Sequence, residues 1–145
     1  MPFATEARLR VRYAETDQMG VVYYANYLVW MEIGRVELCR ALGFNYRDME
    51  REDGIYLAVA EAQCRYRAPA RYDDEVVVKT WVEEANRRMV TFGYELRTAD
   101  ADPGGSRVLA TGHTRHVYVS RDFQRIPLPE KYHAMFGIGT AQTTV

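Results

Sequence analysis

Polar and apolar residues alternate near the start of the chain. Between residues 7 and 13, apolar Ala7, Leu9, Val11 and Tyr13 alternate with Arg8, Arg10 and Arg12. This is the two-residue period of a strand with one buried and one solvated face. The alternation predicts a strand of an antiparallel sheet over residues 7–13.

From residue 26 the apolar spacing changes to three and four residues, which is the period of a helix. The run contains Tyr27, Trp30, Met31, Gly34, Leu38, Ala41 and Leu42, and Gly43 follows it. We expect one long helix with Asn26 as its N-cap and Gly43 as its stop. Gly34 destabilises such a helix by up to ~1 kcal/mol relative to alanine, a cost that is better tolerated if a sheet passes close by.

Four more strands are predicted after the helix. The first has one face of mostly small residues (Tyr56, Ala58, Ala60, Ala62, Cys64 and Tyr66), which suits a close approach to the helix at Gly34. Apolar alternation marks two others, at 76–82 and 90–96, and the last runs from Val108 to Val119. The segment Asp100–Gly105 is the strong loop signal between the last two.

This order of elements excludes a parallel array of strand–helix–strand units. It predicts an α+β fold in which an antiparallel five-stranded sheet curls around one long helix. A short helix near Pro129–Met135 and a frayed tail from Gly137 are expected to complete the chain. We expect residues 1–145 to form a single domain.

Composition narrows the functional classes. The chain has 145 residues and a formal net charge of −1, so no general field attracts nucleic acid or an anionic membrane. Its start lacks a basic stretch followed by an apolar run, and no apolar segment approaches the ~20 residues of a membrane span. Cys39 and Cys64 have no CxxC spacing and are expected to be reduced, buried thiols. We therefore expect a cytoplasmic protein without membrane insertion.

The segment with the densest chemistry is the loop between the first strand and the helix. Asp17 lies there among aromatic and aliphatic residues, and Gly20 permits a sharp turn back toward the helix start. The unpaired N–H groups of a helix N-terminus stabilise an oxyanion, so a catalytic carboxylate and an oxyanion hole would fit in one segment. An aspartate before a helix is also typical of a simple turn or cap, and the residues alone leave both roles open.

The string Tyr-x-Glu-Thr-Asp-x-x-Gly-Val-Val-Tyr-Tyr-x-Asn-Tyr at 13–27 resembles the signature of the 4-hydroxybenzoyl-CoA thioesterase family. The resemblance is to its acyl-CoA thioesterase branch, associated in many bacteria with the Tol-Pal operon, and it extends over roughly residues 7–132. It implies a hot-dog fold, hydrolysis of an acyl-coenzyme A, and a homodimer or homotetramer with active sites at the subunit interface. It implies no metal and no redox cofactor.

Carried onto this sequence, the resemblance makes Asp17 the catalytic carboxylate, as nucleophile or general base. It makes a backbone N–H near Tyr24 the oxyanion donor. Many members of the branch have histidine at the position of Tyr24, and a role of that imidazole in proton transfer does not carry over to tyrosine. Tyr24 is instead expected to bond the thioester or to form a wall of the pocket. Residues Gly20, Val21, Tyr23 and Asn26 are expected to contact substrate.

Two arginine clusters are candidates for binding the phosphates of coenzyme A. Arg87 and Arg88 form one, and Ser120, Arg121 and Arg125 belong to the other. In the fold implied by the resemblance both lie near the mouth of the acyl tunnel. Solvated turn residues remain the alternative for each.

Other chemistry is less well supported. His113 and His116 have an odd separation on a predicted strand, which points them to opposite faces and disfavours a shared metal. Glu32 and Glu37 lie on the helix away from its core stripe, where surface or interface roles are expected. Two other functions stay open: a hydroxyacyl hydratase or dehydratase, and a non-catalytic acyl-CoA-binding module.

A second apolar line on the helix, formed by Val29, Ile33 and Val36, lies opposite the core stripe. A monomer would leave it in water. We therefore expect at least a dimer, and a tetramer as the state that covers this line.

Overall fold

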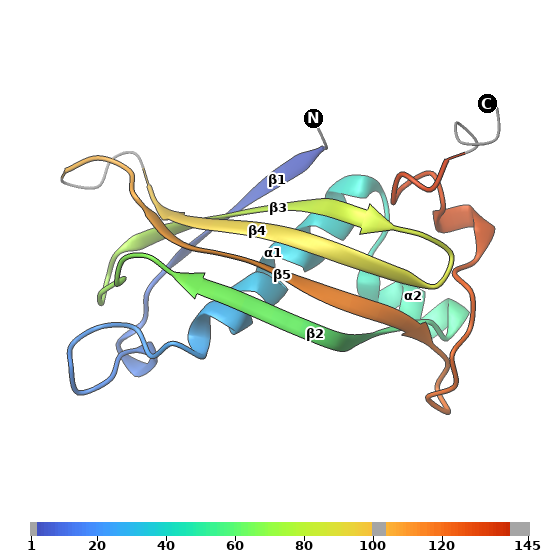
Figure 1. Ribbon diagram of the computed structural model, residues 1–145, viewed down its shortest axis with the longest axis horizontal. Coiled ribbons are helices and arrows are strands. Elements are labelled where there is room, and N and C mark those ends of the chain that lie inside the picture. The colour runs from blue at the N-terminus through green and yellow to red at the C-terminus, as the bar shows by residue number, and fades with distance from the viewer. Residues whose placement is uncertain (1–2, 100–103, 140–145) are drawn as a thin grey trace.

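The computed structural model describes residues 3–99 and 104–139. Its centre is a five-stranded sheet in the order β1-β3-β4-β5-β2, which curves around helix α1 (Figure 1). The strands are β1 (Ala4–Arg10), β2 (Tyr56–Tyr66), β3 (Glu75–Ala85), β4 (Met89–Thr98) and β5 (Val108–Val119). Every neighbouring pair is antiparallel, which confirms the predicted sheet.

Helix α1 spans Asn26–Leu42, as predicted, and ends at Gly43 in a left-handed conformation with φ of 114°. Its inner stripe, including Trp30, Met31 and Leu38, is buried against the sheet. The predicted N-cap is wrong, because Ala25 is the cap residue and Asn26 is the first residue of the helix. The Asn26 amide instead reaches back to the Glu15 carbonyl at 2.9 Å.

The close approach at Gly34 exists, but the predicted partner strand is wrong. A Cβ on Gly34 would lie 2.7 Å from Val78 Cγ1 and would also overlap Thr80, and both residues belong to β3. Strand β3 lies inside the sheet, directly under α1, whereas β2 is at an edge. The small residues of β2 therefore do not receive the helix at this point.

The first strand is shifted relative to the prediction. It begins at Ala4 and ends at Arg10, and Tyr13 lies instead in a 3-10 helix over Tyr13–Glu15. Tyr13 is 77% exposed. The chain leaves the sheet after Val11, whose N–H and C=O bond to Asp74 and Asp73 in the loop before β3. Apolar alternation alone could not show where this pairing stops.

A second helix, α2 (Tyr46–Asp53), was not predicted. It has 8 residues and buries one of them, Met49, so its apolar pattern is too short to predict a helix from the sequence. Near the C-terminus, the expected helix at Pro129–Met135 is reduced to a 3-10 helix, Glu130–Tyr132. Most of the predicted Asp100–Gly105 loop, and the tail from residue 140, lie outside the described residues. No helix in the described part of the chain is long and apolar enough to cross a membrane.

Candidate active site

Asp17 begins a tight turn that is closed by the backbone. Its N–H donates to Val21 O at 2.9 Å, and its carbonyl accepts from Gly20 N at 3.0 Å. Gly20 has φ of 80°, a left-handed conformation that glycine adopts without steric strain. One carboxylate oxygen, Oδ1, accepts from Met19 N at 2.9 Å. The turn thus fixes the carboxylate, as Gly20 in the sequence suggested.

The start of α1 supplies free backbone donors beside this turn. Among the described residues, the N–H groups of Tyr24 and Ala25 have no hydrogen-bond acceptor. The Tyr24 carbonyl, by contrast, accepts from Tyr27 N at 3.3 Å and from the Tyr66 hydroxyl at 2.9 Å. Burial raises the pKa of Tyr66, so its hydroxyl remains protonated as a donor at neutral pH. Free N–H groups at the positive end of a helix dipole favour a negatively charged oxygen.

Asp17 and Tyr24 line one hollow of about 350 Å³. Val21, also predicted, lines it with them. The lining is completed by Met19, Val22, Tyr27, Tyr66, Arg67, Ala68 and Pro69. Of the other predicted contacts, Gly20 shapes the turn, while Tyr23 and Asn26 bond to Glu15 and are outside this lining.

Tyr66 also lines this hollow, although the sequence did not predict it as a site residue. It lies at the end of β2, 42 residues after Tyr24, whose carbonyl it holds. Its ring packs edge-on against Tyr27 and Tyr24, with centroids 5.1 and 6.3 Å apart. An aromatic residue at a strand end gives no local sign of a contact with a distant loop.

Glu15 ties the loop that carries Asp17 to the start of α1. Its carbonyl accepts from Tyr23 N at 2.8 Å and from the Asn26 amide. Its carboxylate, on a residue only 5% exposed, accepts from Arg12 N at 2.8 Å and from the Trp30 indole at 3.0 Å. Burial alone would raise the pKa of Glu15, but these hydrogen bonds and the Arg12 guanidinium bring it below its ordinary value. The Asp17 loop is therefore tied to α1 by an ionised carboxylate.

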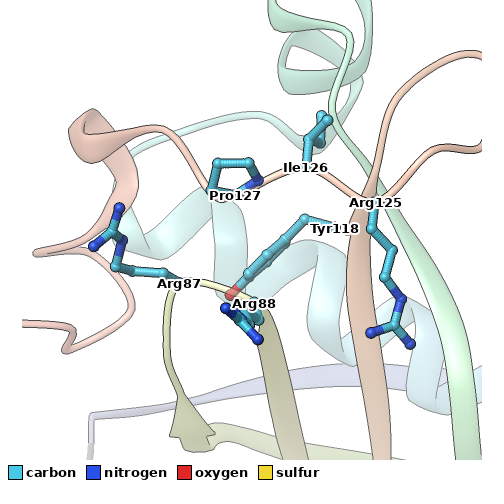
Figure 2. A pocket seen from close by; sticks show the side chains of 6 residues that line it. All are labelled: Arg87, Arg88, Tyr118, Arg125, Ile126 and Pro127. Atoms are coloured by element: carbon cyan, nitrogen blue, oxygen red, sulfur yellow. The ribbon is translucent and has the colours of Figure 1, made fainter.

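A second hollow, of about 520 Å³, lies where the β3–β4 turn meets the segment after β5. Three arginines from the two predicted clusters, Arg87, Arg88 and Arg125, line it with Tyr118, Ile126 and Pro127 (Figure 2). The two loops are joined by Leu128 N, which donates to Arg87 O at 3.0 Å, and by the Tyr118 hydroxyl, which donates to Asn86 O. The fold thus unites the two clusters at one concave cationic surface.

Two predicted members of this group lie elsewhere. Arg121 donates to the carbonyls of Glu50 and Arg51 at 3.1 and 2.9 Å, which caps the C-terminal end of α2. Ser120 Oγ accepts from Gln124 N within its own turn. Neither residue lines the arginine hollow.

The loop that carries Asp17 and the β3–β4 turn that carries Arg87 and Arg88 lie at opposite ends of the sheet (Figure 1). Strand β3 begins beside the Asp17 end, where Asp74 O accepts from Val11 N, and it ends just before Arg87. Its 11 residues, at about 3.3 Å each, span roughly 35 Å. Within one chain, therefore, Asp17 and the arginine hollow do not form one continuous site.

The histidines lie away from Asp17. His113 pairs with Glu61 at 2.8 Å on a partly exposed face, whereas His116 is fully buried, so the two point to opposite faces as predicted. His133 bonds to Leu128 O. In the described residues, no group of three or more His, Cys, Asp or Glu side chains is placed to hold a metal ion.

Comparison with known proteins shows that the chain is similar to thioesterases. The chain is 47% identical over 92 residues to YneP of Bacillus subtilis, and 34% identical over 88 residues to the acyl-CoA thioesterase YbgC of Haemophilus influenzae. These alignments cover 63% and 61% of this chain, and the chain spans 66% of YneP and 65% of YbgC. The crystal structure of DHNA-CoA thioesterase from Staphylococcus aureus superposes with a TM-score of 0.86 at 32% identity, covering 97% of this chain and 93% of that one.

Residues 19–104, more than half of the chain, match the family described as the thioesterase superfamily. The expected hot-dog fold, with its five-stranded antiparallel sheet, is confirmed by this match and by the solved structures. The chain belongs to the thioesterase superfamily.

Proposed function

We propose that this protein hydrolyses an acyl-coenzyme A thioester to a free acid and coenzyme A, with Asp17 as the catalytic carboxylate. The observation that carries the proposal is the shared hollow, which is lined by both Asp17 and Tyr24, a residue whose N–H has no acceptor among the described residues. Acyl transfer requires this pair of features: a group that attacks or activates water, and donors for the oxyanion. The thioesterase names of the relatives support the same reaction class.

In the proposed reaction, the thioester carbonyl oxygen accepts a hydrogen bond from Tyr24 N–H. Asp17 either deprotonates a water that attacks the carbonyl carbon, or attacks it directly to give an anhydride that water then opens. In both routes the C–S bond breaks and the thiolate of coenzyme A leaves, taking up a proton. The Tyr24 ring, 60% exposed at the edge of the hollow, is placed to form a wall for the acyl group.

The arginine hollow is proposed to bind the phosphates of coenzyme A. Because it lies at the far end of its own sheet, it would serve the Asp17 of a second chain. Strand β2 offers an edge for this assembly, with Val59, Ala60, Glu61 and Ala62 exposed and no strand beyond it in the described part of the chain. Two β2 edges paired antiparallel around a two-fold axis would bring the arginine end of one chain toward the Asp17 end of the other.

One experiment separates this function from its two alternatives. The protein is incubated with a panel of aliphatic and aromatic acyl-CoAs and a thiol reagent. Release of free thiol supports hydrolysis, a change in acyl absorbance without thiol supports a hydratase or dehydratase, and binding without turnover supports a binding module. No described histidine lines the Asp17 hollow, which argues against the hydratase reading, since such sites usually pair a histidine with a carboxylate.

We also propose that the chain belongs to the acyl-CoA thioesterase branch associated with the Tol-Pal operon. It would act in the cytoplasm as a homodimer or homotetramer. The exposed Val29 and Ile33 on α1 support an assembly larger than the β2 dimer.

A further inference from the structure

Phe123 has an unusual backbone conformation for an aromatic residue. It lies in the turn after β5, where its φ is 61° and its N–H donates to Ser120 O at 2.8 Å. Ser120 N donates to Gln124 O, which closes the turn. The left-handed region is sterically unfavourable for a residue with a bulky side chain, and glycine or asparagine is the usual occupant.

The chain gains little packing from this residue. Phe123 is 72% exposed, so its ring covers little of the protein's own apolar surface. Glycine in this turn would avoid both the steric strain and the exposed ring. A strained, exposed aromatic residue suggests a role in binding rather than in folding.

Phe123 belongs to the same turn as one arginine of the proposed phosphate site. Two residues further on, Arg125 pairs with Val119 across the base of the turn and lines the arginine hollow with Arg87 and Arg88. The turn that holds the ring therefore also positions one of the three guanidinium groups. A ligand that joins phosphates to a flat aromatic base would match both features.

We propose that Phe123 is a stacking platform for the adenine ring of coenzyme A, while the arginines bind its phosphates. This inference rests on the proposed function, because it takes the carrier to be coenzyme A. Purine rings stack on aromatic side chains without needing a specific hydrogen-bond pattern. A phenylalanine held at a loop tip presents its face with few rotatable bonds to order on binding.

Binding of free coenzyme A and of pantetheine to the full-length protein, measured by calorimetry, tests this role. In Phe123→Asn the left-handed turn is retained, because asparagine tolerates it, but the ring is removed. The Kd for coenzyme A should rise about tenfold, within the range expected for one stacked base. The Kd for pantetheine, which lacks the nucleotide, should not change. Phe123→Trp should restore the affinity for coenzyme A.

Unchanged coenzyme A affinity in Phe123→Asn would overturn the proposal, and so would an equal loss for pantetheine. Light scattering distinguishes a third outcome: if Phe123→Asn dissociates the oligomer without weakening coenzyme A binding, the ring is a subunit contact and the proposal is wrong. The proposed function is judged separately by thiol release from acyl-CoA in the wild-type protein. Turnover with no effect of Phe123→Asn rejects the platform alone, whereas failure of the wild type to release thiol rejects the hydrolase.

Discussion

The indole N–H of Trp30 donates to the buried carboxylate of Glu15 at 3.0 Å, which joins the core stripe of α1 to the loop that carries Asp17. Trp30 is itself 1% exposed, so this hydrogen bond is shielded from solvent. Glu15 lies two residues before Asp17, and its carbonyl also holds Tyr23 and Asn26. The position of the proposed catalytic carboxylate therefore depends on a residue that does not face the hollow.

Glu15→Gln should lower the free energy of unfolding by about 2 kcal/mol, because the amide presents a donor where two donors already converge. It should also lower kcat several-fold. Glu37→Gln, which breaks the exposed ion pair with Arg40, is the matched control and should cost under about 1 kcal/mol. Since the folded-state pKa of Glu15 is lowered, its contribution is present above the ordinary carboxyl pKa and is lost as pH falls through the folded-state value. Denaturant titrations should show the wild-type protein and Glu15→Gln converging in their free energy of unfolding at low pH.

Asp17→Asn should lower kcat at least about 100-fold while leaving the circular dichroism spectrum and coenzyme A binding intact, because the amide is neither a base nor a nucleophile. Asp73→Asn is a suitable control, as Asp73 is an exposed acid near the same end of the sheet and asparagine tolerates its φ of 72°. Retention of more than about a tenth of wild-type kcat in Asp17→Asn would contradict a direct role. Heavy-oxygen label in Asp17 after turnover in labelled water would indicate the anhydride route, and its absence would favour the general base.

The double change Arg87→Ala/Arg88→Ala should raise KM for acyl-CoA several-fold with little change in kcat, because phosphate contacts are equal in the ground and transition states. Arg125→Ala should act in the same direction. Arg121→Ala is the control: it removes a cap from α2 and should lower the melting temperature without raising KM. If a pantetheine thioester is hydrolysed as efficiently as the acyl-CoA, the nucleotide is not recognised, and a carrier-protein-bound substrate becomes the better hypothesis.

Sedimentation should show at least a dimer at micromolar concentration. Ala60 lies at the bulge in β2 and has no register partner in β5, so Ala60→Pro spares the chain's own paired residues while blocking a second β2 edge. This variant should shift toward monomer and lose turnover. Ile33→Lys on the exposed face of α1 should disrupt only assembly beyond the dimer. An active Ala60→Pro monomer would contradict the shared site.

His116 should make stability depend on pH. Its Nδ1 bonds to Leu57 O and its Nε2 to Thr114 Oγ1, and burial lowers its pKa from 6.5 to about 4. The unfolded chain therefore binds a proton between these values that the folded chain excludes, and stability falls as pH drops from 6.5 toward 4. The loss from this residue should be on the order of 3 kcal/mol. His116→Asn should lack this part of the pH dependence, whereas His113→Asn, at a partly exposed site, should retain it.

The local pattern of the sequence determined most of the secondary structure. The spacing of Tyr27, Trp30 and Leu38, with Gly43 after them, located α1, and alternation located four of the five strands closely. The motif around Asp17 also predicted a turn beside the helix start, because Gly20 lies three residues after Asp17 and the helix begins a few residues later. These features depend on neighbours in the chain, so one sequence is sufficient to reveal them.

Tertiary structure decided which distant residues meet. Gly34 packs against β3 rather than β2 because strand order is set by long-range pairing. Tyr66 joins the Asp17 hollow from 42 residues beyond Tyr24, and Arg125 joins Arg87 and Arg88, while Arg121, four residues away, turns to α2. Charge and residue type made all these arginines equal candidates in the sequence. Only the folded backbone, which fixes where each side chain lies, separates the arginines that line the hollow from the arginine that caps a helix.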